Sequence, residues 1–187
     1  EFLTISNDLS QNPPLIFKTL QKTLITFAKK NYNIKIFDHG CGSGRMIFYF
    51  YAIGFKNVYG VNVNDDVEHL NKILSIVENR KIKSFFKTSG SNLPFKDNFF
   101  DIIVILNSIF HWENIDKGLE EISRVMKNNS IVYIGEERLK NGCLHGNNEL
   151  KHFKNFKNFL NKKGFKDVIM KNYFFKNEGF YFFSEKK

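Results

Sequence analysis

One carboxylate and three glycines lie close together in the sequence, directly after an apolar run. Asp38 ends the run, and Gly40, Gly42 and Gly44 follow at every second position. Glycine lets the backbone approach a ligand closely and adopt angles that other residues avoid. Residues 45–52 contain no helix-breaking residue, so the loop is expected to open a helix whose first amides point at a ligand. The pattern predicts a ligand-binding loop between a strand and a helix.

Two other interpretations of the glycine loop follow from its spacing. A dinucleotide-binding loop has the pattern Gly-x-Gly-x-x-Gly, and counting from Gly40 places Arg45 where the third glycine belongs. This difference argues against an NAD-dependent oxidoreductase. A tight turn that binds no ligand is the second alternative, because short glycine patterns also arise in such turns.

The pattern Asp-x-Gly-x-Gly-x-Gly resembles the first motif of class I S-adenosylmethionine-dependent methyltransferases. Four further segments are similar to the small-molecule branch of this family and occur in the same order. They are Leu93-Pro94-Phe95, Phe100-Asp101, His111-Trp112 and Arg124-Val125-Met126-Lys127. Agreement of several motifs in order and spacing is more specific than any one of them. The resemblance covers the chain from about residue 34 to its C-terminus.

The resemblance implies S-adenosylmethionine as the cofactor and assigns residues to it. The glycine loop would line the methionine moiety, and Asp38 would accept hydrogen bonds from the cofactor ammonium or from loop amides. The expected cofactor-binding residues are Asp38, Gly40, Cys41, Gly42, Gly44, Asn62, Val63, Ser89, Gly90, Ser91 and Asn107. No metal is expected, because neither Cys41 nor Cys143 lies in a cluster with zinc spacing.

Three positions depart from the family pattern. Asn62 stands where the family usually has an acid that grips both ribose hydroxyls, and a neutral amide is the weaker acceptor unless Asp65 or Asp66 substitutes. Ser89 stands where relatives often place an Asp near the adenine amine. Residues 128–130, Asn-Asn-Ser, replace a Pro-Gly-Gly turn, and Asn tolerates the left-handed conformation that such a turn needs.

The family's reaction needs little from an acid or base, since methyl transfer from a sulfonium releases a neutral thioether. If the acceptor must lose a proton, His111 is the catalytic candidate, with His145 and Glu136 as further groups near the acceptor. Phe110, Trp112 and residues 139–149 are candidates for the acceptor wall. His39 is expected to point into solvent or to bond locally, and no chemistry is assigned to it.

Alternating apolar patterns predict the elements that must hold the loop. Strands are expected at residues 34–38, 57–63, 82–86, 100–106, 131–135, 165–174 and 180–184, and helices at 15–30, 45–53, 65–77 (after an Asn64 cap), 115–126 and 150–160. This order predicts an α/β fold with a doubly wound, mostly parallel seven-stranded sheet and a C-terminal antiparallel hairpin, the class I methyltransferase fold. One domain is expected over residues 1–187, with an N-terminal helical extension (1–31) and a core (32–187).

The amino-acid composition indicates which classes of partner and which cellular compartment to expect. The chain has 28 basic and 19 acidic residues and a formal charge of +9, but its lysines are spread along the sequence, so nucleic acid is a possible partner that is not favoured. Two cysteines and no signal peptide or membrane span indicate a cytoplasmic protein without a membrane partner. The sequence therefore predicts S-adenosylmethionine-dependent methyl transfer to a small-molecule acceptor. The alternatives are a cofactor-binding protein with weak or no catalysis, and an RNA or protein methyltransferase.

Overall fold

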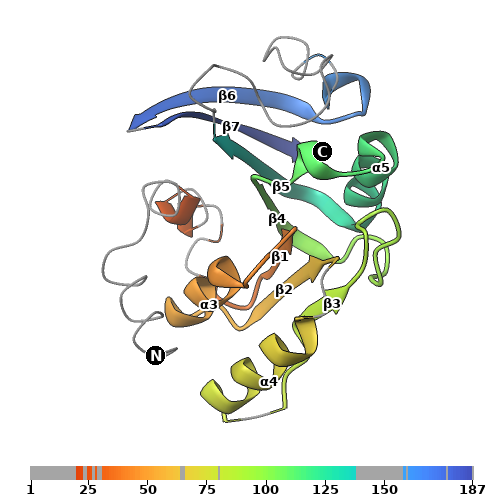
Figure 1. Ribbon diagram of the computed structural model, residues 1–187. Helices are drawn as coiled ribbons and strands as arrows, with labels where there is room; N and C mark the ends of the chain where they lie inside the picture. The colour runs from red at the N-terminus through yellow and green to blue at the C-terminus, as the bar shows by residue number, and fades with distance from the viewer. Residues whose placement is uncertain are drawn as a thin grey trace.

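The computed structural model describes residues 20–22, 25, 26, 28, 31–63, 66–79, 81–137, 158, 160–175 and 177–186. Side chains are described within this set except at residues 110, 136, 137 and 167–186. The centre of the molecule is a seven-stranded sheet with the strand order β3-β2-β1-β4-β5-β7-β6 (Figure 1).

The strands pair in parallel from β3 to β5, and β7 and β6 join the far edge as antiparallel strands. In chain order the elements are β1 (Lys35–His39), α3 (Arg45–Ala52), β2 (Asn57–Asn62), α4 (Val67–Val77), β3 (Phe85–Lys87), β4 (Phe100–Leu106), the 3-10 helix η1 (Ile109–His111), α5 (Ile115–Val125), β5 (Met126–Glu137), β6 (Lys166–Phe175) and β7 (Asn177–Lys186). The doubly wound α/β fold expected from the sequence is confirmed.

Both faces of the parallel strands are buried, which explains their nearly continuous apolar runs. Along β4, Ile102 and Val104 belong to the core on one face, while Ile103 and Ile105 belong to the core on the other. Helices α3 and α4 cover the first face and α5 covers the second (Figure 1). Because β1 is central in this arrangement, its carboxyl end and the loop after it have a rigid support.

Each helix start near the site has a local cause. Gly44, with φ 76°, takes the left-handed conformation that lets the loop turn into α3. The side chain of Asn114 accepts a hydrogen bond from the Lys117 amide at 2.9 Å and caps α5. Helix α4 starts later than expected, at Val67 after Asp66, and the expected cap Asn64 lies outside the described residues.

Other boundaries also differ from the expectation. Strand β3 is shorter, and side chains of α4, Ser75 and Asn71, accept hydrogen bonds from the backbone amides of residues 82, 84 and 85. Strand β5 starts at Met126, because the helix ends one residue earlier than its apolar pattern predicts. The expected turn at residues 128–130 lies inside this strand, where the register against β4 shifts, and Asn129 has a φ of 58°.

Two of the sequence motifs stabilise the fold behind the site. Arg124 donates to the carbonyl oxygens of Leu93 (3.1 Å) and Phe95 (2.8 Å) and to both carboxylate oxygens of Glu121 (2.7 Å each). Glu121 in turn accepts a hydrogen bond from the Leu93 amide at 2.7 Å. The Leu-Pro-Phe segment is therefore fixed to α5 by one planar, multiply bonded cation.

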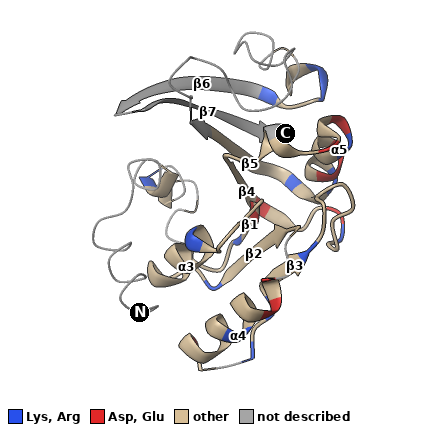
Figure 2. Cartoon of the chain, viewed as in Figure 1, with Lys and Arg blue, Asp and Glu red and all other residues tan. Residues whose placement is uncertain are grey.

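Basic residues do not gather on a single element. Figure 2 shows Lys and Arg on α3, on α4, near β3 and on β5, with Asp and Glu concentrated on α5. The lysines at 151, 154 and 157 lie outside the described residues. None of the helices in the described ranges has the length and apolar character needed to cross a membrane.

Candidate functional site

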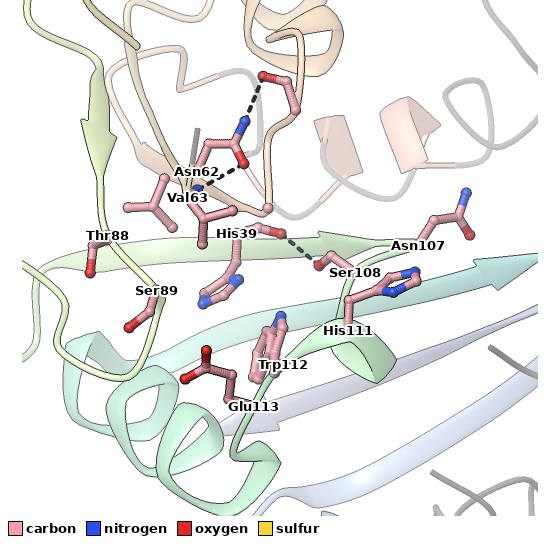
Figure 3. Close-up of a pocket in the computed structure, with 13 residues that line it drawn as sticks. His39, Asn62, Val63, Thr88, Ser89, Asn107, Ser108, His111, Trp112 and Glu113 are labelled. Atoms are coloured by element: carbon pink, nitrogen blue, oxygen red, sulfur yellow. Dashed lines mark hydrogen bonds between the residues drawn. The ribbon is translucent and has the colours of Figure 1, made fainter. Parts of the chain in front are cut away.

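A cavity of about 380 Å³ lies at the carboxyl ends of β1, β2 and β4. This is the edge at which open α/β sheets bind their ligands. The residues around it come from the glycine loop, the ends of β2 and β3, and the segment after β4 (Figure 3). The lining residues are His39, Gly40, Gly42, Val61, Asn62, Val63, Thr88, Ser89, Asn107, Ser108, His111, Trp112 and Glu113.

The glycine loop is held by β2 and keeps one position open. The amides of Gly40 and Cys41 donate to the Val61 carbonyl oxygen at 3.1 and 3.0 Å. A Cβ on Gly40 would lie 2.6 Å from Ser108, and one on Gly44 would lie 2.7 Å from Phe85. A Cβ on Gly42 would meet nothing within 4 Å. Gly42 therefore presents bare backbone to open space at the cavity, as the ligand interpretation of the loop requires.

Asn62, at the end of β2, braces this loop. Its Nδ2 donates to the Gly42 carbonyl oxygen at 3.2 Å, and its Oδ1 accepts from the Val63 amide at 2.9 Å (Figure 3). A carboxylate at this position could not donate to Gly42. An amide oxygen has two lone pairs, so one acceptor position of Oδ1 is left for a ligand hydroxyl. The departure from the family pattern thus has a structural role in this chain.

Asp38 and Cys41 are buried behind the loop. The Asp38 side chain is 3% exposed, and burial raises the pKa of its carboxyl to about 7. The amides of Gly40, Cys41 and Gly44 donate to backbone carbonyls, so these three loop amides are not the donors expected for Asp38. Burial also raises the pKa of the Cys41 thiol, which rules against a thiolate nucleophile at neutral pH.

His39 does not point into solvent, which was one of the two placements expected for it. The side chain is 3% exposed and lines the cavity between Ser89 and Trp112 (Figure 3). Its ring centroid lies 4.0 Å from that of Trp112, with the ring planes tilted by 39°. Burial lowers the pKa of His39 to about 4, and the backbone near Gly90 opposes this shift only in part. His39 is therefore neutral at physiological pH.

The segment after β4 forms the opposite wall. Asn107 has a left-handed φ of 49°, and its backbone amide donates to the Gly135 carbonyl oxygen at 2.8 Å. Ser108 Oγ donates to the His39 carbonyl oxygen at 2.9 Å and ties this wall to β1. The side chains of His111 and Glu113 follow at the exposed rim of the cavity. An imidazole and a carboxylate at a rim can accept a proton from a bound acceptor.

The structure brings together eight of the residues expected at the site: Gly40, Gly42, Asn62, Val63, Ser89, Asn107, His111 and Trp112. Five expected residues do not line the cavity: Asp38, Cys41, Gly44, Gly90 and Ser91. Sequence reasoning missed His39, Val61, Thr88, Ser108 and Glu113. All five directly precede or follow a residue that the sequence analysis named. This adjacency in sequence is the signal that could have identified them. His145 and residues 139–149 lie outside the described set, as does the side chain of Glu136.

The cavity fits a nucleoside cofactor better than a metal. Open backbone at Gly42, an acceptor on Asn62, the buried His39 ring and the half-buried Trp112 ring offer contacts to a polar ligand with a flat base. Within the described ranges, no three His, Cys, Asp or Glu side chains come together as metal ligands would. Fold and cavity together define an α/β protein with a cavity at the switch point of a parallel sheet, the place where such folds bind ligands.

Comparison with known proteins identifies the family. The profile of the methyltransferase domain family matches residues 37–134, more than half of the chain. The chain belongs to this family, within the class I S-adenosylmethionine-dependent methyltransferases. The matched range includes the glycine loop and every described wall of the cavity. S-adenosylmethionine, the cofactor expected from the sequence, is confirmed as the cofactor of this class.

Two curated proteins and one solved structure illustrate the likeness. An uncharacterized protein of Methanocaldococcus jannaschii is 30% identical over 129 residues, which are 67% of this chain and 51% of that protein. The ubiquinone/menaquinone biosynthesis C-methyltransferase UbiE of Campylobacter jejuni is 27% identical over 68% of this chain and 54% of its own. The chain spans about half the length of these curated relatives. A crystal structure of a SAM-dependent methyltransferase from Aquifex aeolicus shares the fold, with a TM-score of 0.67, 18% identity, and coverage of 98% of this chain and 97% of that chain.

Proposed function

We propose that this protein transfers a methyl group from S-adenosylmethionine to a small-molecule acceptor. The observation that carries the proposal is the cavity of about 380 Å³, which joins the open Gly42 backbone to a rim bearing His111 and Glu113. Its volume is in the range of small-molecule sites. A cofactor and part of an acceptor can therefore occupy one continuous space.

The proposed cofactor contacts follow from the geometry of the wall. Gly40 and Gly42 line the amino acid part, with the buried Asp38 carboxylate behind them as the counter-charge for an ammonium group. Asn62 Oδ1 accepts from a ribose hydroxyl. Val63, whose side chain is 62% exposed, covers one face of the base, and Ser89 lies near its edge.

Methyl transfer requires little acid or base chemistry from the protein's own residues. The bound cofactor supplies a methyl group whose leaving group is a neutral thioether. The protein must hold the acceptor in line and exclude water, which can supply a large part of the acceleration. The wall after β4, fixed to β1 through Ser108 and to β5 through Asn107, provides a rigid surface for that alignment. His111 accepts the acceptor's proton where one must leave.

Two alternatives have separate support. A protein that binds the cofactor weakly and transfers no methyl group is favoured by Asn62, since its side chain offers the ribose only one neutral acceptor position. An RNA or protein acceptor is favoured by the formal charge of +9. The scattered Lys and Arg residues on the described elements give no single basic face for such an acceptor (Figure 2).

Calorimetric titration with S-adenosylhomocysteine tests the cofactor step first. Saturable binding is expected, and no heat at millimolar ligand would overturn the proposal. Methyl transfer is then assayed by release of S-adenosylhomocysteine with three acceptor pools: aromatic hydroxyl compounds, amines and total RNA. Turnover with a small-molecule pool supports the proposal, and turnover with RNA alone supports the second alternative. Binding without turnover in any pool supports the non-catalytic alternative.

A further inference from the structure

His39 and Trp112 place two polar aromatic rings side by side in the cavity wall. Neither ring nitrogen of His39 makes a hydrogen bond to the described residues, and the same holds for Nε1 of Trp112. Both side chains line the cavity (Figure 3). Buried polar groups in folded proteins nearly always have a partner, so two neighbouring exceptions at a cavity point to a ligand.

Two glycines make room for these rings. A Cβ at Gly90 would overlap the His39 imidazole, and a Cβ at Gly118 would overlap the Trp112 indole. Gly90 follows the turn after β3, and Gly118 lies in the first half of α5. Two separate elements thus give up a side chain so that the rings can pack at the cavity.

The imidazole of His39 can offer a hydrogen bond of either kind. A neutral imidazole has one N–H donor and one acceptor nitrogen. The torsion between Cβ and Cγ of His is roughly two-fold, so half a turn exchanges ring nitrogens and carbons within the same volume. Either a nitrogen or a carbon can therefore occupy each of these ring positions without movement of β1.

The surroundings of His39 indicate a flat, uncharged ligand part. Trp112 and the exposed Val63 provide apolar surfaces, and Ser89 provides a hydroxyl. A purine base is flat and carries donors and acceptors on its edge, which matches a neutral imidazole. We propose that His39 is a specificity-determining residue whose acceptor nitrogen takes a hydrogen bond from the exocyclic amine of the cofactor base. This proposal rests on the function proposed above.

Binding of two ligands that differ only in the base tests the proposal. S-adenosylhomocysteine carries adenine, and S-inosylhomocysteine carries hypoxanthine, in which a carbonyl oxygen replaces the amine. The unmodified protein is expected to bind the adenine ligand about tenfold more tightly than the hypoxanthine ligand. This ratio corresponds to the free energy of one well-made hydrogen bond. His39→Leu should weaken binding of the adenine ligand by about that factor and leave the hypoxanthine ligand nearly unchanged. His39→Gln, which keeps a donor and an acceptor, should retain part of the preference.

Thermal unfolding of the free protein separates this role from simple packing. An unpartnered buried imidazole destabilises the free protein, so His39→Leu should raise Tm by about 3 °C. His69→Leu, on the exposed face of α4, is the matched control and should change neither affinity nor base preference. A lowered Tm with equal weakening of both ligands would show that His39 only packs. Failure of the unmodified protein to bind either ligand would instead overturn the proposed function, and this proposal with it.

Discussion

The side-chain amide of Asn62 donates to the carbonyl oxygen of Gly42 at 3.2 Å, so the end of β2 is bonded to the open position of the glycine loop. Asn62→Asp would lose this donor and place a carboxylate at the cavity. A charged acceptor bonds a ribose hydroxyl more strongly than a neutral one, and the lost bond is long and exposed. We expect the variant to bind S-adenosylhomocysteine about fivefold more tightly, a gain of about 1 kcal/mol.

Titration calorimetry against S-adenosylhomocysteine and its 2′-deoxy analogue checks this prediction. The gain should be confined to the ligand with both ribose hydroxyls. Asn79→Asp, at the left-handed residue after α4 and away from the cavity, serves as the control. Weaker binding of both ligands by Asn62→Asp would show that the brace on the loop outweighs the ribose contact.

Asp38 gives cofactor binding a dependence on pH. Its pKa is raised to about 7 by burial, so below that pH the carboxyl is mostly protonated and cannot pair with a cation. Binding of a ligand ammonium requires the carboxylate, so affinity should fall about tenfold for each pH unit below 7 and level off above it. Titration of S-adenosylhomocysteine between pH 5.5 and about 8 measures this. Asp38→Asn should bind weakly at every pH, and an unchanged slope in that variant would assign the dependence to another group.

The same carboxyl affects stability in the opposite direction. Its pKa in the unfolded chain is near the usual value of 3.8, and in the folded protein it is about 7, so the folded state binds the extra proton between these values. The stabilisation is therefore complete below pH 4 and is lost as the pH rises through 7. Above pH 7 Asp38→Asn should be more stable than the unmodified protein by roughly 4 kcal/mol, and near pH 4 the two should converge. Urea unfolding across this range checks it, with the exposed Asp66→Asn as control.

The loop before β4 depends on a single guanidinium. Arg124 bonds Glu121, the Leu93 and Phe95 carbonyls and the Asp97 carboxylate, and a lysine cannot reproduce this planar fork. Arg124→Lys should lower the free energy of unfolding by about 2 kcal/mol, because buried acceptors near Leu93 lose their donors. Arg45→Lys, exposed on α3, should stay within about 0.5 kcal/mol. Equal effects of the two substitutions in urea unfolding would contradict the structural role.

The sequence predicted regular elements better than the irregular segments between them. Strand β4 has the bounds expected from its apolar run, since a strand buried on both faces needs no tertiary information to be recognised. The predicted start of β5 was wrong, because the residues that were expected to form a turn lie inside the strand, at a register shift against β4. The loop glycines were found by their spacing, but burial of His39 depends on Gly90, which is distant in sequence. No local sequence pattern predicts a contact between residues so far apart in the chain.

The last prediction separates the two roles of the glycine loop. Alanine at Gly42 or Gly44 must adopt a positive φ, of 49° or 76°, which costs about 1 kcal/mol in either case. At Gly44 the new Cβ would also lie 2.7 Å from Phe85, within a packed core, whereas at Gly42 it would enter open cavity space. Gly44→Ala should therefore lose about 2 to 3 kcal/mol of stability. Gly42→Ala should lose about 1 kcal/mol of stability and at least tenfold in affinity for S-adenosylhomocysteine. Paired unfolding and binding curves measure both effects, and tight binding by Gly42→Ala would show that the ligand does not approach this backbone.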